Sequence, residues 1–363
     1  MIRIDSDTLA KWGQECLNST AFSLVDGTQY VLQATCDTEV ARHVIGIYRI
    51  GMVIADSIIP PFAFRELKNG EVAICKDSVG ELVFGLLTQL ECEEFSESFP
   101  LHELNPVCGR LLEMIEERQL VDRIRSPRWR LDSDGKRSLV AELNSFVDGY
   151  RQEILSDAFS ARMNRYLAHS TEIERGLLSQ IDHAFQRTSR AMAIRMDFGY
   201  NPPEALPDGP GSVDLDEATS HRDALLMALR NVFEDSLLSC TWKLEHCREK
   251  GYGYHVLFIF DACKVSDDLA AGAVIGGAWD VAVTKGAGIH LSYNADSRIS
   301  NAYGLGVISR RQTQAVRAFK EQTVTSMVRG DFFMQIRPEL AAQTFGTVCH
   351  EHGGYLPLKE NLS

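Results

Sequence analysis

The chain has 363 residues, of which 45% are hydrophobic and 24% are charged, and its formal net charge is −13 at pH 7. This is the composition of a globular protein, so disordered, collagen-like and coiled-coil chains are excluded. The acidic balance argues against a protein that coats nucleic acid through bulk charge, because such a protein needs a strong positive field.

The charge is unevenly distributed along the chain. Residues 1–120 hold 9 Lys+Arg and 19 Asp+Glu, a net charge of −10, and the remaining 28 and 31 leave residues 121–363 with a net charge of −3. A basic stretch at residues 123–130 marks the change. We therefore expect an acidic α/β module of unknown role over residues 1–130, and this module is the part better suited to a protein partner.

No segment is both long and apolar enough to span a bilayer, because the most apolar run, residues 44–61, contains Arg49, Asp56 and Pro60. The first residues do not form a secretory signal. Nine scattered cysteines form no C-x-x-C motif, which disfavours a disulfide framework or a zinc ribbon. We expect a cytoplasmic protein that does not contact membranes.

The first half of the chain predicts mixed secondary structure. Residues 29–34 and 43–50 are rich in β-branched side chains and predict two strands. The pair Asn105-Pro106 predicts a helix with proline in its first turn. Residues 131–190 have apolar side chains at helical spacing and form the predicted helical lead-in to the next part.

Strands and helices alternate over residues 191–350. The predicted elements are strands at 191–200, 237–245, 254–261, 289–294 and 332–337, helices at 216–235, 267–282 and 310–328, and a long loop at 201–212. This order predicts an α+β domain, an antiparallel-rich sheet with helices on one face. Residues 351–363 are expected to be a C-terminal tail.

Three polar side chains lie at strand ends of this predicted sheet. Glu245 is at the exit of one strand, His255 is at the entrance of the next, and Asp197 is near the end of the first. Carboxylate and imidazole groups that share a sheet face can hold a divalent cation against a phosphodiester. The alternatives are a buried histidine at the start of a core strand and an aspartate in a strand-end turn.

Residues 135–347 resemble a known family. The blocks that carry the resemblance are residues 189–190 (SR), 194–200 (IRMDFGY), 242–245 (WKLE), 251–261 (GYGYHVLFIFD), 275–279, 286–294, 304–308 and 344–346 (TFG). Their order and spacing are similar to the YagK/YfjJ C-terminal domain family, the replication proteins of filamentous phages (inoviruses), prophages and mobile elements. That family is similar to rolling-circle initiators of the HUH endonuclease superfamily, so the resemblance implies an HUH/RRM-like fold.

The resemblance also implies an active site. In such initiators, two histidines and an acidic residue bind Mg²⁺ or Mn²⁺, and a tyrosine on a later helix attacks the phosphate. Here the implied metal ligands are His255, Glu245 and Asp197, while Gly253 stands at the first histidine position.

The implied nucleophile position holds Ser326, and the implied lysine position holds Arg329. Tyr293 and Tyr303 are alternative nucleophiles outside the expected helix. The loss of one histidine and of the tyrosine together predicts a degenerate nicking site.

A final set of basic residues is expected to contact nucleic acid, either single-stranded DNA or a DNA hairpin. These residues are Arg195, Arg310, Arg311, Arg317 and Lys320. A solvated helix face is the alternative interpretation for those after residue 309. The triplet 128–130 (RWR) can stack on and pair with single-stranded nucleic acid, or it can be a linker.

These observations support three functional hypotheses. The first is a DNA-binding, replication-initiator-like protein of a prophage or mobile element, with a degenerate nicking site. The second is an active metal-dependent DNA nickase. The third is a non-catalytic regulatory or phage-defence interaction protein.

Overall fold

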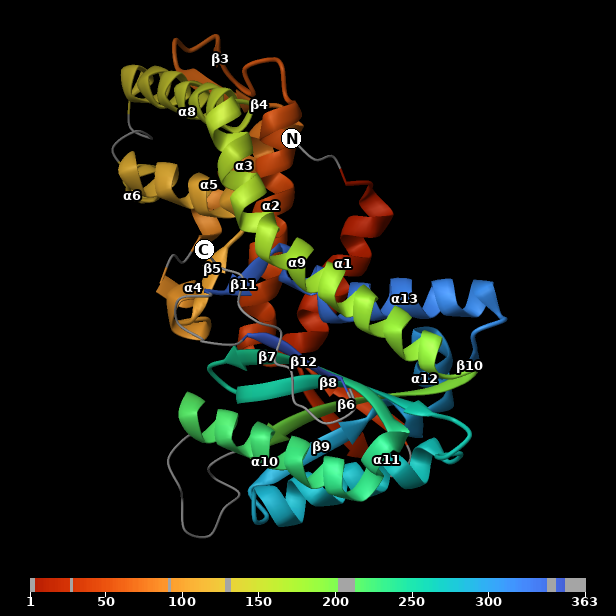
Figure 1. Ribbon diagram of the computed structural model, residues 1–363. Helices are drawn as coiled ribbons and strands as arrows, with labels where there is room; N and C mark the ends of the chain where they lie inside the picture. Colours follow the sequence, from red (N-terminus) through yellow and green to blue (C-terminus); the bar gives the residue numbers. More distant parts are fainter. Residues whose placement is uncertain are drawn as a thin grey trace.

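The computed structural model describes residues 4–26, 29–90, 93–127, 132–201, 213–337 and 344–349 (Figure 1). The protein is α+β with antiparallel sheets, as predicted. The main sheet is formed by β10 (Gly306–Ser309), β6 (Arg190–Tyr200), β8 (Gly251–Asp261), β7 (Leu237–Cys247) and β12 (Phe345–Cys349) in that spatial order, and β9 (Gly288–Ser292) pairs with β6. The strands predicted at 191–200, 237–245, 254–261 and 289–294 are therefore confirmed.

Helices cover both faces of this sheet. One face packs against α10 (Leu215–Phe233) and α11 (Asp268–Gly277), which the π-helix η3 (Ala278–Val283) continues. The other face packs against α9 (Asp157–Arg187) and α13 (Thr313–Met327). The prediction of helices on one face is therefore incomplete, because the lead-in helix α9 folds back over the second face (Figure 1).

The N-terminal half is more helical than predicted. Its helices are α1 (Ser6–Thr20), α2 (Cys36–Asp56), α3 (Ser78–Gln89), α4 (Glu93–Ser98), α5 (Pro106–Glu117), α6 (Leu120–Arg125) and α8 (Ser133–Ile154). Its strands are β1 (Phe22–Asp26), β2 (Gln29–Gln33), β3 (Phe62–Glu66), β4 (Val72–Lys76) and β5 (His102–Leu104). The strand at 29–34, the helix after Asn105 and the helical lead-in are confirmed.

The strand predicted at 43–50 is wrong, because these residues lie inside α2. Val44, Ile47 and Tyr48 are buried at helical spacing, and this periodicity overrides their β propensity. A capping box between Thr35 and Thr38 fixes the start of the helix.

The C-terminal segment returns to the N-terminal half. The 3₁₀ helix η5 (Arg329–Phe332) and strand β11 (Met334–Ile336) follow α13, and β11 pairs with β5 rather than with the main sheet. Phe333 is fully buried in the core of α2, α5 and α8. The strand predicted at 332–337 exists but has a different partner from the one expected, and the first hydrophobic core does not end at residue 130.

Three sequence features lie outside the described residues. They are the triplet 128–130, the tail 351–363, and all but the first residue of the loop 201–212. None of the helices in the described part of the chain is long and apolar enough to cross a membrane.

Candidate functional site

The central strands place three predicted ligands on one face of the main sheet. His255 on β8 lies directly opposite Asp197 on β6 and opposite Lys243 on β7. Directly opposed residues in antiparallel strands share a face, and so do residues two apart along a strand, which adds Glu245. The pairing of β8 with β6 and β7, together with alternation within each strand, therefore brings these four side chains together.

His255 bridges the two carboxylates. Its Nδ1 faces Oδ1 of Asp197 and its Nε2 lies 2.7 Å from Oε2 of Glu245. Burial lowers the pKa of His255, but the two carboxylates outweigh it and raise the pKa overall. Burial raises the pKa of each carboxyl group, yet His255 holds the pKa of Asp197 below its ordinary value and that of Glu245 well below. This arrangement favours the imidazolium form of His255, which can donate from both ring nitrogens.

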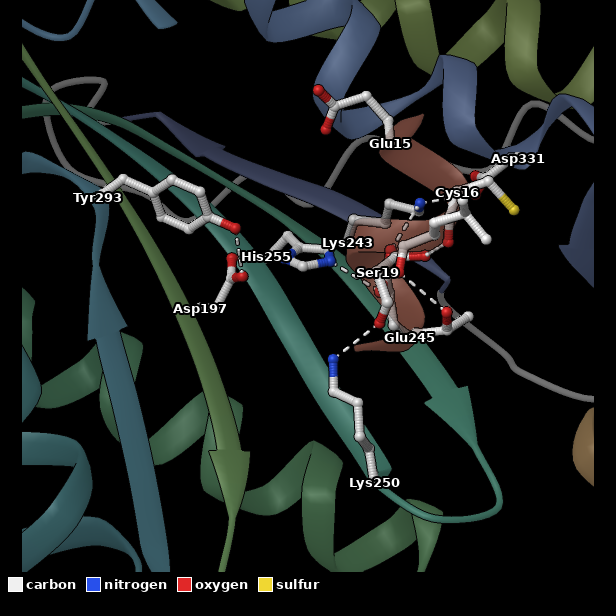
Figure 2. A network of polar contacts seen from close by, with 12 residues as sticks. Glu15, Cys16, Ser19, Asp197, Lys243, Glu245, Lys250, His255, Tyr293 and Asp331 are labelled. Atoms are coloured by element: carbon white, nitrogen blue, oxygen red, sulfur yellow. Dashed lines mark hydrogen bonds and ion pairs between the residues drawn. The ribbon is translucent and has the colours of Figure 1, made fainter. Parts of the chain in front are cut away.

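Lys243 extends the network to η5. Its Nζ lies 3.0 Å from Oε1 of Glu245 and 2.6 Å from Oδ1 of Asp331. Burial raises the pKa of the Asp331 carboxyl group. Figure 2 shows this chain of contacts beneath α1, where Nζ of Lys250 donates to the backbone carbonyl of Ser19 at 2.7 Å.

At the other end of the network are two tyrosines and an arginine. The hydroxyl of Tyr293 donates to Oδ2 of Asp197 at 2.7 Å. The guanidinium Cζ of Arg195 lies 4.4 Å from the ring centroid of Tyr293 and 4.9 Å from that of Tyr303. Tyr303 in turn donates to both carboxylate oxygens of Glu15 on α1, at 3.1 and 3.2 Å. Opposite charges thus alternate from Glu15 to Asp331.

A cavity of about 120 Å³ adjoins this network. Asp197, Lys243, Glu245 and His255 form part of its wall. Residues of α1, α9, β5, β9, η5, β11 and the hairpin between β7 and β8 contribute to the remainder. The volume suffices for several ordered waters but is smaller than the ~300–1,000 Å³ typical of ligand pockets.

The predicted metal ligands meet, but their arrangement does not fit Mg²⁺ or Mn²⁺. Both nitrogens of His255 face carboxylates, and the Lys243 ammonium occupies the other oxygen of Glu245. A metal ligand must instead present free lone pairs toward one point. No group of three or more His, Cys, Asp or Glu side chains within the described ranges has such an arrangement.

The predicted nucleophile and its neighbour lie away from the network. Ser326 is buried and its hydroxyl donates to the carbonyl of Thr323 on the same helix. Arg329 pairs with Glu174 and lies 5.0 Å over the ring of Trp12. Neither Ser326 nor Arg329 lines the cavity.

The two alternative tyrosines belong to the network. Tyr293 is buried there, while Tyr303 is half-buried and bonded to Glu15. Gly253, at the implied first histidine position, lies against the Phe198 carbonyl, so a Cβ at Gly253 would lie 3.0 Å from that oxygen.

The predicted nucleic-acid contacts divide into two groups. Arg310, Arg311 and Arg317 are exposed, and their side chains form no ion pair within the described parts of the chain. Lys320 is paired with Asp182. Arg195 is buried, so it does not lie on the surface as expected.

Sequence reasoning missed Lys243, Asp331 and Glu15. Lys243 had a usable signal, because it is two residues before Glu245 in the same strand. Asp331 and Glu15 reach the site from η5 and α1, and no local sequence pattern predicts that these two elements pack there.

Comparisons with protein-family models, curated proteins and solved structures find no match to this chain. The family resemblance of residues 135–347 therefore stays a prediction.

Proposed function

We propose that the protein binds DNA through the arginine-bearing end of its main sheet, as a replication-initiator-like protein of a prophage or mobile element without metal-dependent nicking. The observation that carries the proposal is the unpaired state of Arg310, Arg311 and Arg317 within the described structure. Exposed arginines elsewhere vary: Arg298 pairs with Asp296, whereas Arg49 and Arg65 also form no ion pair within the described ranges. What sets this group apart is that three such arginines lie together within residues 310–317.

The sheet positions these arginines at one corner. Ser309 of β10 is opposite Arg190 of β6, and the backbone N–H of Arg310 donates to the carbonyl of Ser189 at 3.0 Å. Arg311 follows directly, and Arg317 lies about one turn inside α13. Free guanidinium groups at such a corner suit phosphate oxygens, which they contact by paired hydrogen bonds.

The closed network supports the non-catalytic part of the proposal. A metal-dependent nickase needs a histidine with a free lone pair and an accessible nucleophile. His255 is held by two carboxylates, and Ser326 is buried within its own helix.

The binding test uses fluorescence anisotropy with a labelled single-stranded oligonucleotide and a DNA hairpin at several salt concentrations. The triple variant Arg310→Ala/Arg311→Ala/Arg317→Ala should bind at least tenfold more weakly than wild type. Its log K against log salt slope should be shallower by about 2–3, since each lost phosphate contact removes ~0.7–0.9.

The matched control is Arg49→Ala/Arg65→Ala/Lys68→Ala, which removes the same charge from exposed positions of the N-terminal half. The control should bind like wild type. Equal losses in the two triple variants would show that only bulk charge matters and would refute the proposed surface. Absence of wild-type binding at low salt would favour the regulatory interaction protein.

The nicking test incubates supercoiled plasmid with the protein and Mn²⁺. We expect no conversion to nicked circles. Cleavage by wild type that disappears in His255→Ala would instead establish the active nickase.

A further inference from the structure

Arg195 is a buried cation whose hydrogen-bonding capacity is unused. Its residue is 4% exposed, and its Nε and Nη1 atoms are buried with no hydrogen-bond partner in the described structure. The rings of Tyr293 and Tyr303 flank the guanidinium and supply cation–π attraction. Arginine stays charged in proteins, so burial does not neutralise it.

The unmet donors have an energetic cost. A buried donor without a partner destabilises the folded protein, and more so when the donor is charged. The cation–π contacts with the two tyrosine rings offset part of this cost. Buried groups of this kind point to an anion or water that completes the site.

The carboxylate of Glu15 on α1 is an anion that already lies beside Tyr303. It accepts the Tyr303 hydroxyl with both oxygens, and its charge acts on Arg195, but no hydrogen bond joins it to the guanidinium. The Tyr303 hydroxyl therefore donates a hydrogen bond, whereas Nε and Nη1 of Arg195 do not. A phosphate has more acceptor oxygens than a carboxylate and can accept from both groups together.

We propose that Arg195 and Tyr303 form a seat for a phosphate group of a nucleic acid, which Glu15 occupies as a competing internal anion. The proposal rests on the proposed DNA binding and adds its regulation, because the acidic first helix then weakens DNA binding. The seat is separate from the corner formed by Arg310, Arg311 and Arg317.

The exchange requires movement of one side chain and not of the helix. The helix α1 is anchored in the first core by Cys16, which is buried, and by Trp12, whose ring centroid lies 5.1 Å from that of Phe332 in a tilted contact. Glu15 and Tyr303 are both half-buried, so the carboxylate can turn toward solvent while α1 stays in place.

The test compares Glu15→Ala with Asp7→Ala. Both changes remove one negative charge from α1, but Asp7 is exposed in the first turn and outside the network. Affinities are measured for inorganic pyrophosphate by calorimetry and for the single-stranded oligonucleotide by anisotropy. We expect Glu15→Ala to bind both probes about tenfold more tightly than Asp7→Ala, and Glu15→Ala/Tyr303→Phe to lose this gain.

The possible outcomes are distinguishable. Equal affinities of the Glu15 and Asp7 variants for both probes would overturn the seat, even if the arginine triple variant shows that the corner binds DNA. Failure of Glu15→Ala to bind pyrophosphate would overturn it as well. Tighter pyrophosphate binding by Glu15→Ala, without DNA binding by any variant, would retain the anion seat and refute the proposed function.

Discussion

The two faces of the main sheet differ sharply although the same strands build both. Toward α10 and α11, β8 presents Val256, Phe258 and Phe260, and this wall is apolar. Toward α9 and α13, β8 presents Leu257 and Ile259 and then, further toward its start, changes to the charged network at His255.

The difference follows from what covers each part of the sheet. Apolar side chains lie where α9 and α13 pack, and charged ones lie where α1 and η5 reach the sheet. A buried charge needs an opposite charge or an aromatic ring face beside it, since desolvation costs several kcal/mol for each ion. The stability of the charged part therefore depends on every ion-pair partner being present. The stability of the apolar part depends on how closely its side chains pack.

The largest loss of stability should come from removing one member of the charged network. Lys243→Met leaves Glu245 and Asp331 close together without their shared cation, and the free energy of unfolding should fall by about 3–5 kcal/mol. Urea denaturation measures the change. Lys264→Met is the matched control, because Lys264 is 46% exposed in its pair with Asp235 and should lose less than about 1 kcal/mol. Similar losses in the two variants would mean that the network adds no stability.

The approach of Glu245 to His255 was predictable from the sequence, because the consecutive strands β7 and β8 form a hairpin and side chains alternate within each strand. The approach of Asp197 was not, because it depends on the pairing of β6 with β8, two strands that are not consecutive along the chain. The chemistry of the site was not predictable, because Lys243 and Asp331 convert a possible metal site into an ion-pair network. Asp331 arrives through tertiary packing that no nearby pattern encodes.

The fold shows the same limit. The long strands β6, β7 and β8 were predicted because their apolar runs are long and bounded by turns. Residues 43–50 were mistaken for a strand because a short β-branched run fits either periodicity until the whole of α2 is considered. The partner of β11 depends on the burial of Phe333 in a distant core.

The second prediction tests shape on the apolar side. A Cβ at Gly276 would lie 2.1 Å from Nε2 of His290, whose ring is fixed by Asp280 at 2.8 Å. Gly276→Ala should therefore destabilise the protein by about 1–3 kcal/mol. Gly277→Ala is the control, since no atom lies within 4 Å of its Cβ and its backbone is helical, so it should be neutral or slightly stabilising. Thermal and urea unfolding of the pair measure the difference, and equal stabilities would refute the close packing.

The smallest effect concerns the pH dependence of the charged part. The lowered pKa values of Asp197 and Glu245 give stability that is present above their ordinary values of 3.8 and 4.5 and is lost as the pH falls. The raised pKa of His255 gives stability that is complete below 6.5 and is lost as the pH rises through the raised value. The network should therefore contribute most between about pH 4.5 and 6.5.

Urea denaturation of wild type and His255→Gln from pH 5 to 9 follows the network of His255 and its two carboxylates, because groups outside that network titrate alike in the two proteins. The advantage of wild type should shrink as the pH rises above 6.5, by about 1.4 kcal/mol for each unit by which folding raises the pKa of His255. A difference that stays constant across this range would show that His255 does not change its charge there. The ring would then keep one protonation state over the whole range, and its contribution to the difference between the two faces would not depend on pH.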